Sequence, residues 1–378
     1  MAGLLMAATP SHPPASHPPA SHPPASHPPA SHPPASHPPA SHPPASHPPA
    51  SHPPASHPPA LATGEHGGDG RRLAEALGVT PCAVLDLSAS LNPLAPPVGR
   101  LLTKLVDEAG RYPDPAYATA AFAEAIGVGP GRLLLTNGGS EAIALVSAEL
   151  RRAVVVEPEF SLWRRHLQQV LAPGTPRVGR VRSNPNNPTG ALAGDHEVAA
   201  VWDEAFYALA TGHWTRGDAD RGATVVGSLT KLFACPGLRL GYVLAPGPEL
   251  LGRLARRQPA WSVSSLALAA LPALVEDAPL TEWAQGVARL RSELAALFEA
   301  AGFRVESRDA PWVLVAEAAW LRPGLAREAV LVRDCANFGL PGWVRVAVPA
   351  EPGLERLARA LDKVLDEGPP PRPPGLEG

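Results

Sequence analysis

The segment from Ser228 to Gly241 constrains this chain more than any other part of its sequence. It places Lys231 three residues after a serine, Ser228, and eight residues before an arginine, Arg239. A lysine amine can form a Schiff base with an aldehyde, while a hydroxyl and a guanidinium can hold a phosphate, so the set fits a pyridoxal phosphate enzyme. The Ser-x-x-Lys pattern also occurs in serine hydrolases and can arise by chance. This segment alone leaves these interpretations open.

Two segments upstream add polar side chains. Residues 184–190 read Asn-Pro-Asn-Asn-Pro-Thr-Gly, which on its own is typical of a plain turn. Residues 201–206 read Val-Trp-Asp-Glu-Ala-Phe, which predicts a short buried strand that ends in two carboxylates. Taken alone, such carboxylates are most often solvated. Together the three segments present Asn187, Asp203 and Lys231 in that order along the chain.

With this order the chain resembles, over about residues 66–365, the fold-type I aminotransferase superfamily of pyridoxal phosphate enzymes. The resemblance implies that Asn187 hydrogen-bonds the ring hydroxyl of the cofactor and that Asp203 pairs with its protonated pyridine nitrogen. It also implies that Lys231 carries the cofactor and moves protons, with Asp203 as the second catalytic residue. The cofactor phosphate would be bound by two more side chains, those of Ser228 and Arg239.

A further cofactor segment is expected where an apolar strand pattern meets a glycine turn at residues 137–139 and then a helical pattern. Backbone N–H groups at a helix start bind anions, although an ordinary strand-to-helix turn reads the same way. The resemblance implies that Gly139 and Ser140 cradle the cofactor phosphate. Phe160, which otherwise reads as a core residue, would stack on the ring. Tyr112 would reach the phosphate of the partner subunit, which implies a homodimer with shared active sites.

Other segments are similar to the threonine-phosphate decarboxylases of cobalamin biosynthesis, which are close to the histidinol-phosphate aminotransferases. They are His-Gly-Gly-Asp at 66–69, Pro-Ala-Trp-Ser-Val-Ser at 259–264, and the stretches 332–338 and 343–347. Phe206 also favours the decarboxylases, because the aminotransferases usually have tyrosine at that position. The resemblance implies decarboxylation of L-threonine O-3-phosphate to (R)-1-aminopropan-2-yl phosphate. A histidinol-phosphate-type aminotransferase is the alternative, and a non-catalytic protein of this fold is less favoured.

A phosphorylated amino acid requires groups that bind anions, and Arg345 and Arg333 match anion-binding arginines of these relatives. Two arginines and a histidine suit a phosphate together with a carboxylate. Arg333 could instead form a surface ion pair, and a lone histidine such as His66 is usually exposed. Ser90 stands where the decarboxylases usually have asparagine, and a serine donates and accepts with a shorter reach. The substrate-binding residues expected from the resemblance are His66, Gly67, Ser90, Asn187, Arg333 and Arg345.

The predicted fold class is α/β, because strand-like runs alternate with helical ones. A large cofactor-binding domain with a mainly parallel sheet is expected over residues 111–258. Its strands are predicted at 132–136, 153–157, 201–204 and 224–228. Helices are predicted at 70–78, 116–126, 140–150, 159–170 and 247–257. Asn187 and Asp203 are only 16 positions apart, so residues 190–200 can form at most a short helix.

The pattern changes near residue 259, and a smaller α+β C-terminal domain is expected over 259–367. A helix is predicted at 281–300, strands at 311–316, 330–333 and 343–348, and a closing helix at 353–366. Residues 61–110 are expected to form an N-terminal arm that joins this smaller lobe.

Residues 11–60 are ten copies of Ser-His-Pro-Pro-Ala. Because proline at this density removes backbone donors and blocks helix formation, residues 1–60 are expected to be a disordered tail. The proline-rich end over 368–378 is expected to behave likewise. The repeated histidines could bind a divalent metal loosely, but nothing in the pattern fixes a coordination geometry.

Composition narrows the possible partners and compartments. The formal net charge of -3 indicates no nucleic-acid or acidic-membrane partner. The three cysteines show no Cys-x-x-Cys spacing, which argues against a disulfide framework and against a zinc site. No stretch approaches the roughly 18 apolar residues of a membrane span. Composition agrees with a cytoplasmic enzyme, and the resemblance implies that it acts on a small phosphorylated substrate.

Overall fold

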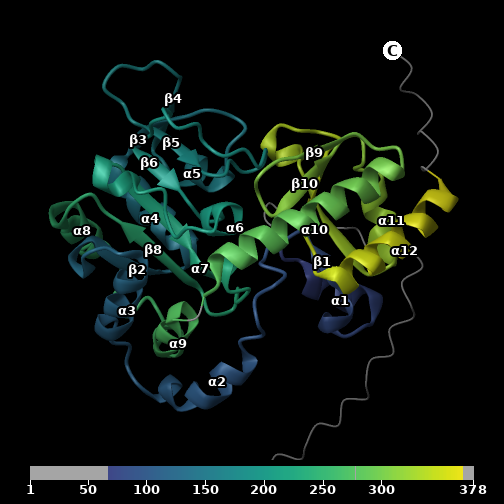
Figure 1. The fold of residues 1–378 in the computed structure, drawn as a ribbon. Helices are drawn as coiled ribbons and strands as arrows, with labels where there is room; N and C mark the ends of the chain where they lie inside the picture. The colour runs from purple at the N-terminus through teal and green to yellow at the C-terminus, as the bar shows by residue number, and fades with distance from the viewer. Residues whose placement is uncertain (1–66, 277, 369–378) are drawn as a thin grey trace, which may run out of the picture. The chain divides into compact units, whose positions relative to one another are not determined.

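The computed structural model describes residues 67–276 and 278–368. Three predictions fall outside these residues: the tail over residues 1–60, the site residue His66 and, apart from Gly368, the C-terminal tail. The boundaries expected at residues 110 and 258 stay predictions. Figure 1 shows the described part of the chain as two sheets with their helices.

The larger sheet has seven strands in the order β2-β8-β7-β6-β5-β3-β4. Strand β8 runs antiparallel to both of its neighbours, and the other adjacent pairs are parallel. The predicted α/β fold with a mainly parallel sheet is confirmed. The strands are β2 (Leu133–Asn137), β3 (Arg152–Val155), β4 (Gln169–Leu171), β5 (Arg180–Ser183), β6 (Val201–Asp203), β7 (Thr224–Ser228) and β8 (Leu240–Leu244).

Successive residues of a strand point to opposite faces of the sheet, so the apolar strands present side chains on both faces. Helices cover both faces of this sheet. On β7, Val225 packs in a cluster with Phe122 and Tyr242, while the next residue, Val226, packs with Ile143 of the helix on the other face. The helices around this sheet are α3 (Ala116–Ile126), α4 (Gly138–Leu150), α5 (Ser161–His166), α6 (Tyr207–Thr211), α7 (Leu229–Leu232), α8 (Pro248–Ala255) and α9 (Ser265–Glu276).

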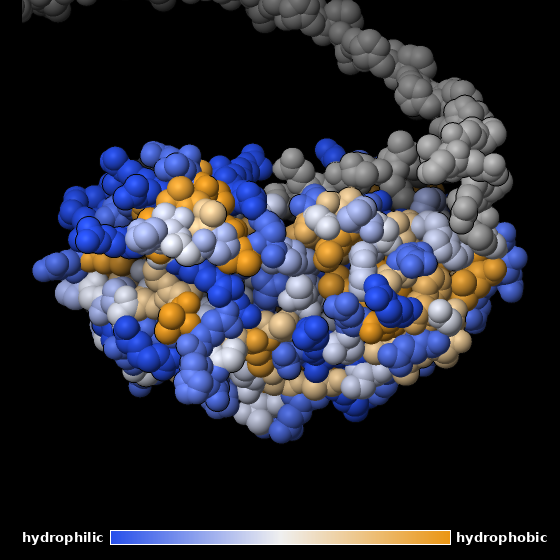
Figure 2. All heavy atoms as spheres, turned by 90° about the horizontal axis from the view of Figure 1, so that it is seen from above, coloured by the Kyte–Doolittle hydropathy of each residue, from blue (hydrophilic) through white to orange (hydrophobic). Residues whose placement is uncertain are grey.

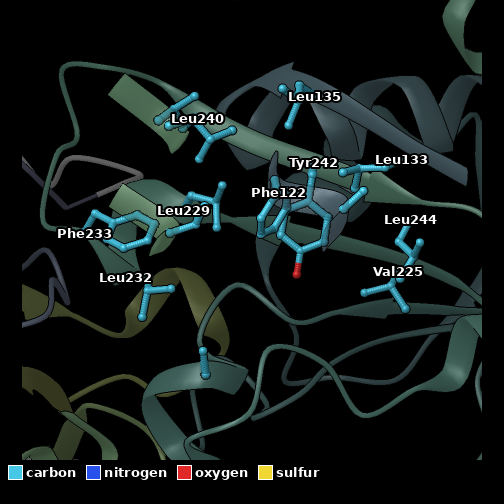
Figure 3. Close-up of a cluster of buried hydrophobic side chains, with 14 of the residues drawn as sticks. Phe122, Leu133, Leu135, Val225, Leu229, Leu232, Phe233, Leu240, Tyr242 and Leu244 are labelled. Atoms are coloured by element: carbon cyan, nitrogen blue, oxygen red, sulfur yellow. The ribbon is translucent and has the colours of Figure 1, made fainter. Parts of the chain in front are cut away.

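One of these clusters is built around Tyr242, which Figure 3 shows beside Phe122. The two rings meet edge to face with centroids 5.0 Å apart. Tyr242 lies opposite Gly227 in the β7–β8 pair. A Cβ added to Gly227 would lie 2.3 Å from the Tyr242 ring, so only glycine leaves room for this side chain.

We expect Gly227→Ala to lower the free energy of unfolding by about 1–3 kcal/mol, because the added methyl overpacks the core against the Tyr242 ring. Urea denaturation of the apoprotein measures the change. Gly129→Ala is the matched control, since Gly129 has a φ of -71° and a Cβ there meets nothing within 4 Å. Equal stabilities for the two variants would contradict the packing argument.

The smaller sheet has five strands in the order β1-β11-β12-β10-β9, and β1–β11 is its parallel pair. The strands are β1 (Leu85–Leu87), β9 (Val305–Ser307), β10 (Trp312–Val315), β11 (Val330–Asp334) and β12 (Val344–Ala347). The remaining α-helices are α1 (Gly70–Leu77), α2 (Gly99–Leu105), α10 (Leu280–Ala300), α11 (Leu321–Arg327) and α12 (Glu351–Glu367).

Helix α10 connects the two sheets. It contacts α6 beside the larger sheet and strands β9 and β10 of the smaller one, as its long course in Figure 1 shows. Short 3₁₀ helices complete the described chain: η1 (Pro81–Ala83), η2 (Val106–Gly110), η3 (Pro130–Arg132), η4 (Asp218–Arg221) and η5 (Ala336–Phe338).

One expected helix is wrong in its second half. A helix is expected over 159–170, but the structure has one only over Ser161–His166. It ends there because Leu167 has extended backbone, with φ -69° and ψ 137°. The amide of Gln168 then donates to the Arg151 carbonyl at 2.8 Å, and β4 pairs with β3. The local pattern did not reveal that residues 169–171 form the edge strand of the sheet.

The short connection between β5 and β6 agrees with its sequence. Residues 190–200 contain no helix. The Arg216 guanidinium instead donates to the carbonyls of Gly194 and Asp195 at 2.8 and 3.1 Å, and its carbon lies 4.9 Å from the centre of the Trp202 ring. This arginine therefore holds the connection against the buried strand β6.

The surface is mixed in character. On the face shown in Figure 2, hydrophilic and hydrophobic residues are interspersed. None of the helices within 67–276 and 278–368 combines the length and the apolar character that crossing a membrane requires.

Candidate active site

A cavity of about 470 Å³ collects most of the residues singled out in the sequence. Twelve of the fourteen predicted site residues line it: Gly67, Ser90, Gly139, Ser140, Phe160, Asn187, Asp203, Ser228, Lys231, Arg239, Arg333 and Arg345. The two others are His66, which lies outside the described residues, and Tyr112. The larger sheet explains this meeting, because Asp203 and Ser228 end parallel strands β6 and β7 and Asn187 follows β5.

Lys231 lies on α7, directly after strand β7, and is partly buried. Its carbonyl accepts a hydrogen bond from the Asn92 amide at 3.0 Å, which fixes the backbone at this point. Burial lowers the pKa of Lys231 to about 8; the charges of Arg345 and Arg239 act in the same direction and that of Asp203 opposes them. The amine is therefore a better nucleophile near neutral pH than an ordinary lysine.

Asp203 ends strand β6, and its side chain is buried. One carboxylate oxygen accepts from the Ala205 amide at 3.1 Å. Burial raises the pKa of Asp203 to about 6, while Lys231 opposes this shift. A buried carboxylate of this kind suits a cationic N–H donor, which would keep it ionised.

One end of the cavity is suited to a phosphate. The N-terminus of α4 supplies the backbone amides of Gly139 and Ser140. The Arg239 guanidinium lies 3.4 Å from the Ser140 hydroxyl, and a Cβ on Gly138 would lie 2.5 Å from that guanidinium. Gly138 also has a φ of +71°, a left-handed conformation that favours glycine.

Another part of the cavity wall is formed by two buried arginines from the smaller sheet. Arg345 on β12 lies opposite Arg333 on β11. Arg345 donates through Nη1 to Asn187 Oδ1 at 2.6 Å and through Nη2 to the Ser88 carbonyl at 3.4 Å. Burial lowers the pKa of Arg345 to about 10. Arg333 is only 5% exposed, so its alternative interpretation as a surface ion pair is wrong.

An aromatic pair joins this wall to the larger sheet. Trp312 on β10 donates from its indole nitrogen to the Pro188 carbonyl at 2.8 Å, next to Asn187. Its ring meets that of Phe206 edge to face with centroids 4.8 Å apart, and the Arg345 guanidinium carbon lies 4.8 Å from its centre. The cavity wall at this point is thus built from both sheets.

The sequence missed several residues that line the cavity. Thr230 and Phe338 lie in segments that the sequence singled out but were given no role there, Ser88 lies two residues before Ser90, and Arg165 and His166 lie in a helix with no site pattern. Thr230 pairs with the predicted Ser228, their hydroxyl oxygens 2.7 Å apart. Arg165 and His166 reach the cavity through the fold, so no local sequence signal could have identified them, whereas Thr230 is the neighbour of Lys231 in the chain.

Two predicted residues have distinctive surroundings. Ser90 is 1% exposed, and its hydroxyl has no hydrogen-bond partner among the described residues, which leaves it available to a bound molecule.

Tyr112 is 80% exposed and does not line the cavity; its ring lies 4.8 Å from that of Trp261. Its expected reach into a partner subunit stays a prediction.

Comparison with known proteins decides the family. Residues 141–364 match the model for aminotransferase class I and II. This chain belongs to that family. Its members use pyridoxal 5'-phosphate, so this family member is a pyridoxal phosphate-dependent enzyme. The glycine turn and guanidinium at one end of the cavity, together with the buried Asp203 carboxylate, fit that cofactor.

The relatives include both activities considered above. Threonine-phosphate decarboxylase of Salmonella typhimurium is 32% identical over 81% of this chain and 98% of that protein. Histidinol-phosphate aminotransferase 2 of Methylococcus capsulatus is 31% identical over 75% of this chain and 90% of that protein. A solved histidinol-phosphate aminotransferase from Sinorhizobium meliloti, in complex with pyridoxal-5'-phosphate, has a TM-score of 0.64 at 16% identity, covering 79% of this chain and 94% of its own. That last likeness supports the fold alone.

Proposed function

We propose that this enzyme decarboxylates L-threonine O-3-phosphate to (R)-1-aminopropan-2-yl phosphate. The observation that carries the proposal is the facing pair Arg333 and Arg345 at the cavity. Two buried guanidiniums suit a substrate that carries both a phosphate and a carboxylate, because each can bind an oxyanion through two donors. The Salmonella typhimurium relative, matched over 98% of its length, supports the same choice.

The proposed roles of the other residues follow from their chemistry. Ser228, Arg239 and the α4 amides would hold the cofactor phosphate. Asp203 would hold a proton on the pyridine nitrogen, and Asn187 would bind the ring hydroxyl. Bound pyridoxal phosphate supplies an electron sink for a bond that breaks at the substrate Cα. Lys231 would hold the cofactor between turnovers and deliver a proton to Cα after carbon dioxide leaves.

The choice between decarboxylation and amino transfer depends on which Cα bond stands perpendicular to the cofactor ring. Amino transfer needs the C–H bond there, whereas decarboxylation needs the carboxylate there. If Arg333 and Arg345 together anchor the substrate phosphate rather than the carboxylate, the carboxylate would be free to take that perpendicular position. The second candidate is a histidinol-phosphate-type aminotransferase, favoured by the 31% identical relative.

We expect the holoenzyme to release carbon dioxide from L-threonine O-3-phosphate without any keto acid. The assay measures carbon dioxide and the phosphorylated amine, with L-threonine as the control that lacks the phosphate. If turnover instead requires 2-oxoglutarate and forms glutamate from histidinol phosphate, the second candidate replaces the first.

We also propose that the enzyme is a cytoplasmic homodimer. Exposed Tyr112 and Trp261 are accessible to a second copy of this chain, which supports the expectation that Tyr112 contributes to the partner's site. Sedimentation equilibrium of the full chain tests the dimer directly.

A further inference from the structure

A buried carboxylate behind the cavity has no role in the proposals above. Glu159 precedes Phe160 in the loop between β3 and α5 and is 3% exposed. Its side chain does not line the cavity, but its neighbours Phe160 and Ser183 do. Burying a carboxylate is costly unless donors compensate it, so the contacts of Glu159 indicate what it does.

Four donors converge on this carboxylate. Oε1 accepts from the Phe160 amide at 2.7 Å and from the Ser183 hydroxyl. Oε2 accepts from the Ser183 amide at 3.0 Å and from Asn186 Nδ2 at 3.4 Å. All four groups donate to oxygen, which is the pattern that an ionised carboxylate satisfies. Glu159 thus connects the Phe160 peptide to the end of β5 and to the loop after it.

The connection continues into the cavity. The Ser183 hydroxyl, which donates to Glu159, accepts from the Asn187 amide at 2.9 Å. The side chain of Asn187 in turn accepts from Arg345 at 2.6 Å. Hydrogen bonds therefore link Glu159 through Ser183 to the backbone of Asn187, whose side chain bonds an arginine of the other sheet.

We propose that Glu159 is a positioning residue that fixes Phe160 and Asn187 for pyridoxal phosphate binding. Through the Phe160 amide it holds the peptide that carries the aromatic ring expected to stack on the cofactor. Through the Ser183 hydroxyl it holds the backbone amide of Asn187, the residue expected to bind the ring hydroxyl. This inference rests on the proposed placement of the cofactor in this cavity. It does not depend on whether the enzyme decarboxylates or transfers an amino group.

The amide of glutamine cannot replace the carboxylate here. In Glu159→Gln one oxygen becomes an NH₂ group, which faces donors where an acceptor is needed and leaves buried donors without a partner. We expect this variant to raise the Kd for pyridoxal phosphate about tenfold. It should also change the visible circular dichroism of the bound cofactor, because the aromatic wall and Asn187 shift relative to the ring.

Glu204→Gln is the matched control. Glu204 is also buried, and burial raises its pKa to about 7, as it does for Glu159. Its carboxylate accepts from the Arg216 amide at 3.2 Å, and neither Glu204 nor Arg216 lines the cavity. This variant should lose thermal stability but bind pyridoxal phosphate within about twofold of the wild type, with an unchanged circular dichroism spectrum.

Ser183→Ala tests the connection between Glu159 and Asn187. Because it removes only one hydroxyl, it also serves as the test if Glu159→Gln fails to fold. It breaks the path from Glu159 to Asn187 and leaves the Ser183 amide in place. We expect the same change in circular dichroism as for Glu159→Gln. When Glu159→Gln and Ser183→Ala are combined, the Kd for pyridoxal phosphate should rise by well below the product of the two single fold-increases. The two substitutions interrupt the same chain of contacts, so their effects should not add.

The outcomes distinguish a wrong placement of the cofactor from a wrong role for Glu159. If wild type binds no pyridoxal phosphate, or if Lys231→Ala binds it covalently, the placement of the cofactor fails. If wild type binds it and Glu159→Gln and Ser183→Ala match Glu204→Gln in Kd and spectrum, the placement holds and the role of Glu159 is overturned.

Discussion

Lys231→Ala should yield a protein that no longer forms a covalent bond with pyridoxal phosphate, with turnover at least about 10²–10⁴-fold below that of the wild type. The chain has only three lysines, and Lys231 is the one that lines the cavity. Without its amine, both the attachment of the cofactor and the proton transfer at Cα lose their group. The visible absorbance of the purified protein and a turnover assay measure the two losses.

The other lysines provide the controls. Lys104 on α2 and Lys363 on α12 are exposed, so Lys104→Ala and Lys363→Ala should retain the absorbance and the activity. After borohydride reduction, peptide mapping should find the cofactor on Lys231 alone. A wild-type-like visible spectrum in Lys231→Ala would exclude this lysine as the site of attachment.

The lowered pKa of Lys231 gives this result a pH dependence. Below about pH 8 the amine of the apoprotein is mainly protonated, and above it the amine is mainly neutral and nucleophilic. The rate at which added pyridoxal phosphate attaches to the apoprotein should therefore rise through about pH 8. Stopped-flow absorbance measures it, and an inflection near the ordinary lysine value of 10.5 would contradict the effect of burial.

The cofactor end of the site could be predicted because its residues follow strands. Asp203 and Ser228 end β6 and β7, and strands of a parallel sheet bring their carboxyl ends to one edge. Motifs far apart in sequence therefore meet for a topological reason. The glycine turn before α4 likewise follows β2, whose direction matches those strands.

The other parts of the site, which involve the smaller sheet and Glu159, depend on contacts between residues that are distant in sequence, and no local pattern encodes such contacts. The facing of Arg333 and Arg345 comes from the antiparallel register of β11 with β12. The bond from Ser183 to Glu159 joins residues 24 positions apart, and the contact of Trp312 with Pro188 joins the two sheets. Composition and periodicity predict that such segments form strands, but not which side chains they bring together.

Arg345→Ala should lower kcat/KM for L-threonine O-3-phosphate by about 30- to 4,000-fold. This corresponds to about 2–5 kcal/mol, the cost of leaving a buried anion without its charge-assisted partner. The same change removes a positive charge that lowers the pKa of Lys231, so the pH at which pyridoxal phosphate attaches should move upward. Kinetics and the attachment rate therefore report two separate effects of one guanidinium.

Arg345→Lys distinguishes charge from geometry. Lysine retains one positive charge, but it lacks the planar fork that lets Arg345 donate to Asn187 and to the Ser88 carbonyl at once. We expect its kcat/KM to lie between those of the wild type and Arg345→Ala, with the pKa of Lys231 little changed. Arg304→Ala, which removes an exposed guanidinium stacked on Trp343, should leave both measurements unchanged. If Arg345→Ala behaves like Arg304→Ala, Arg345 does not bind the substrate anion, and the arginine pair no longer supports a phosphorylated amino acid as substrate.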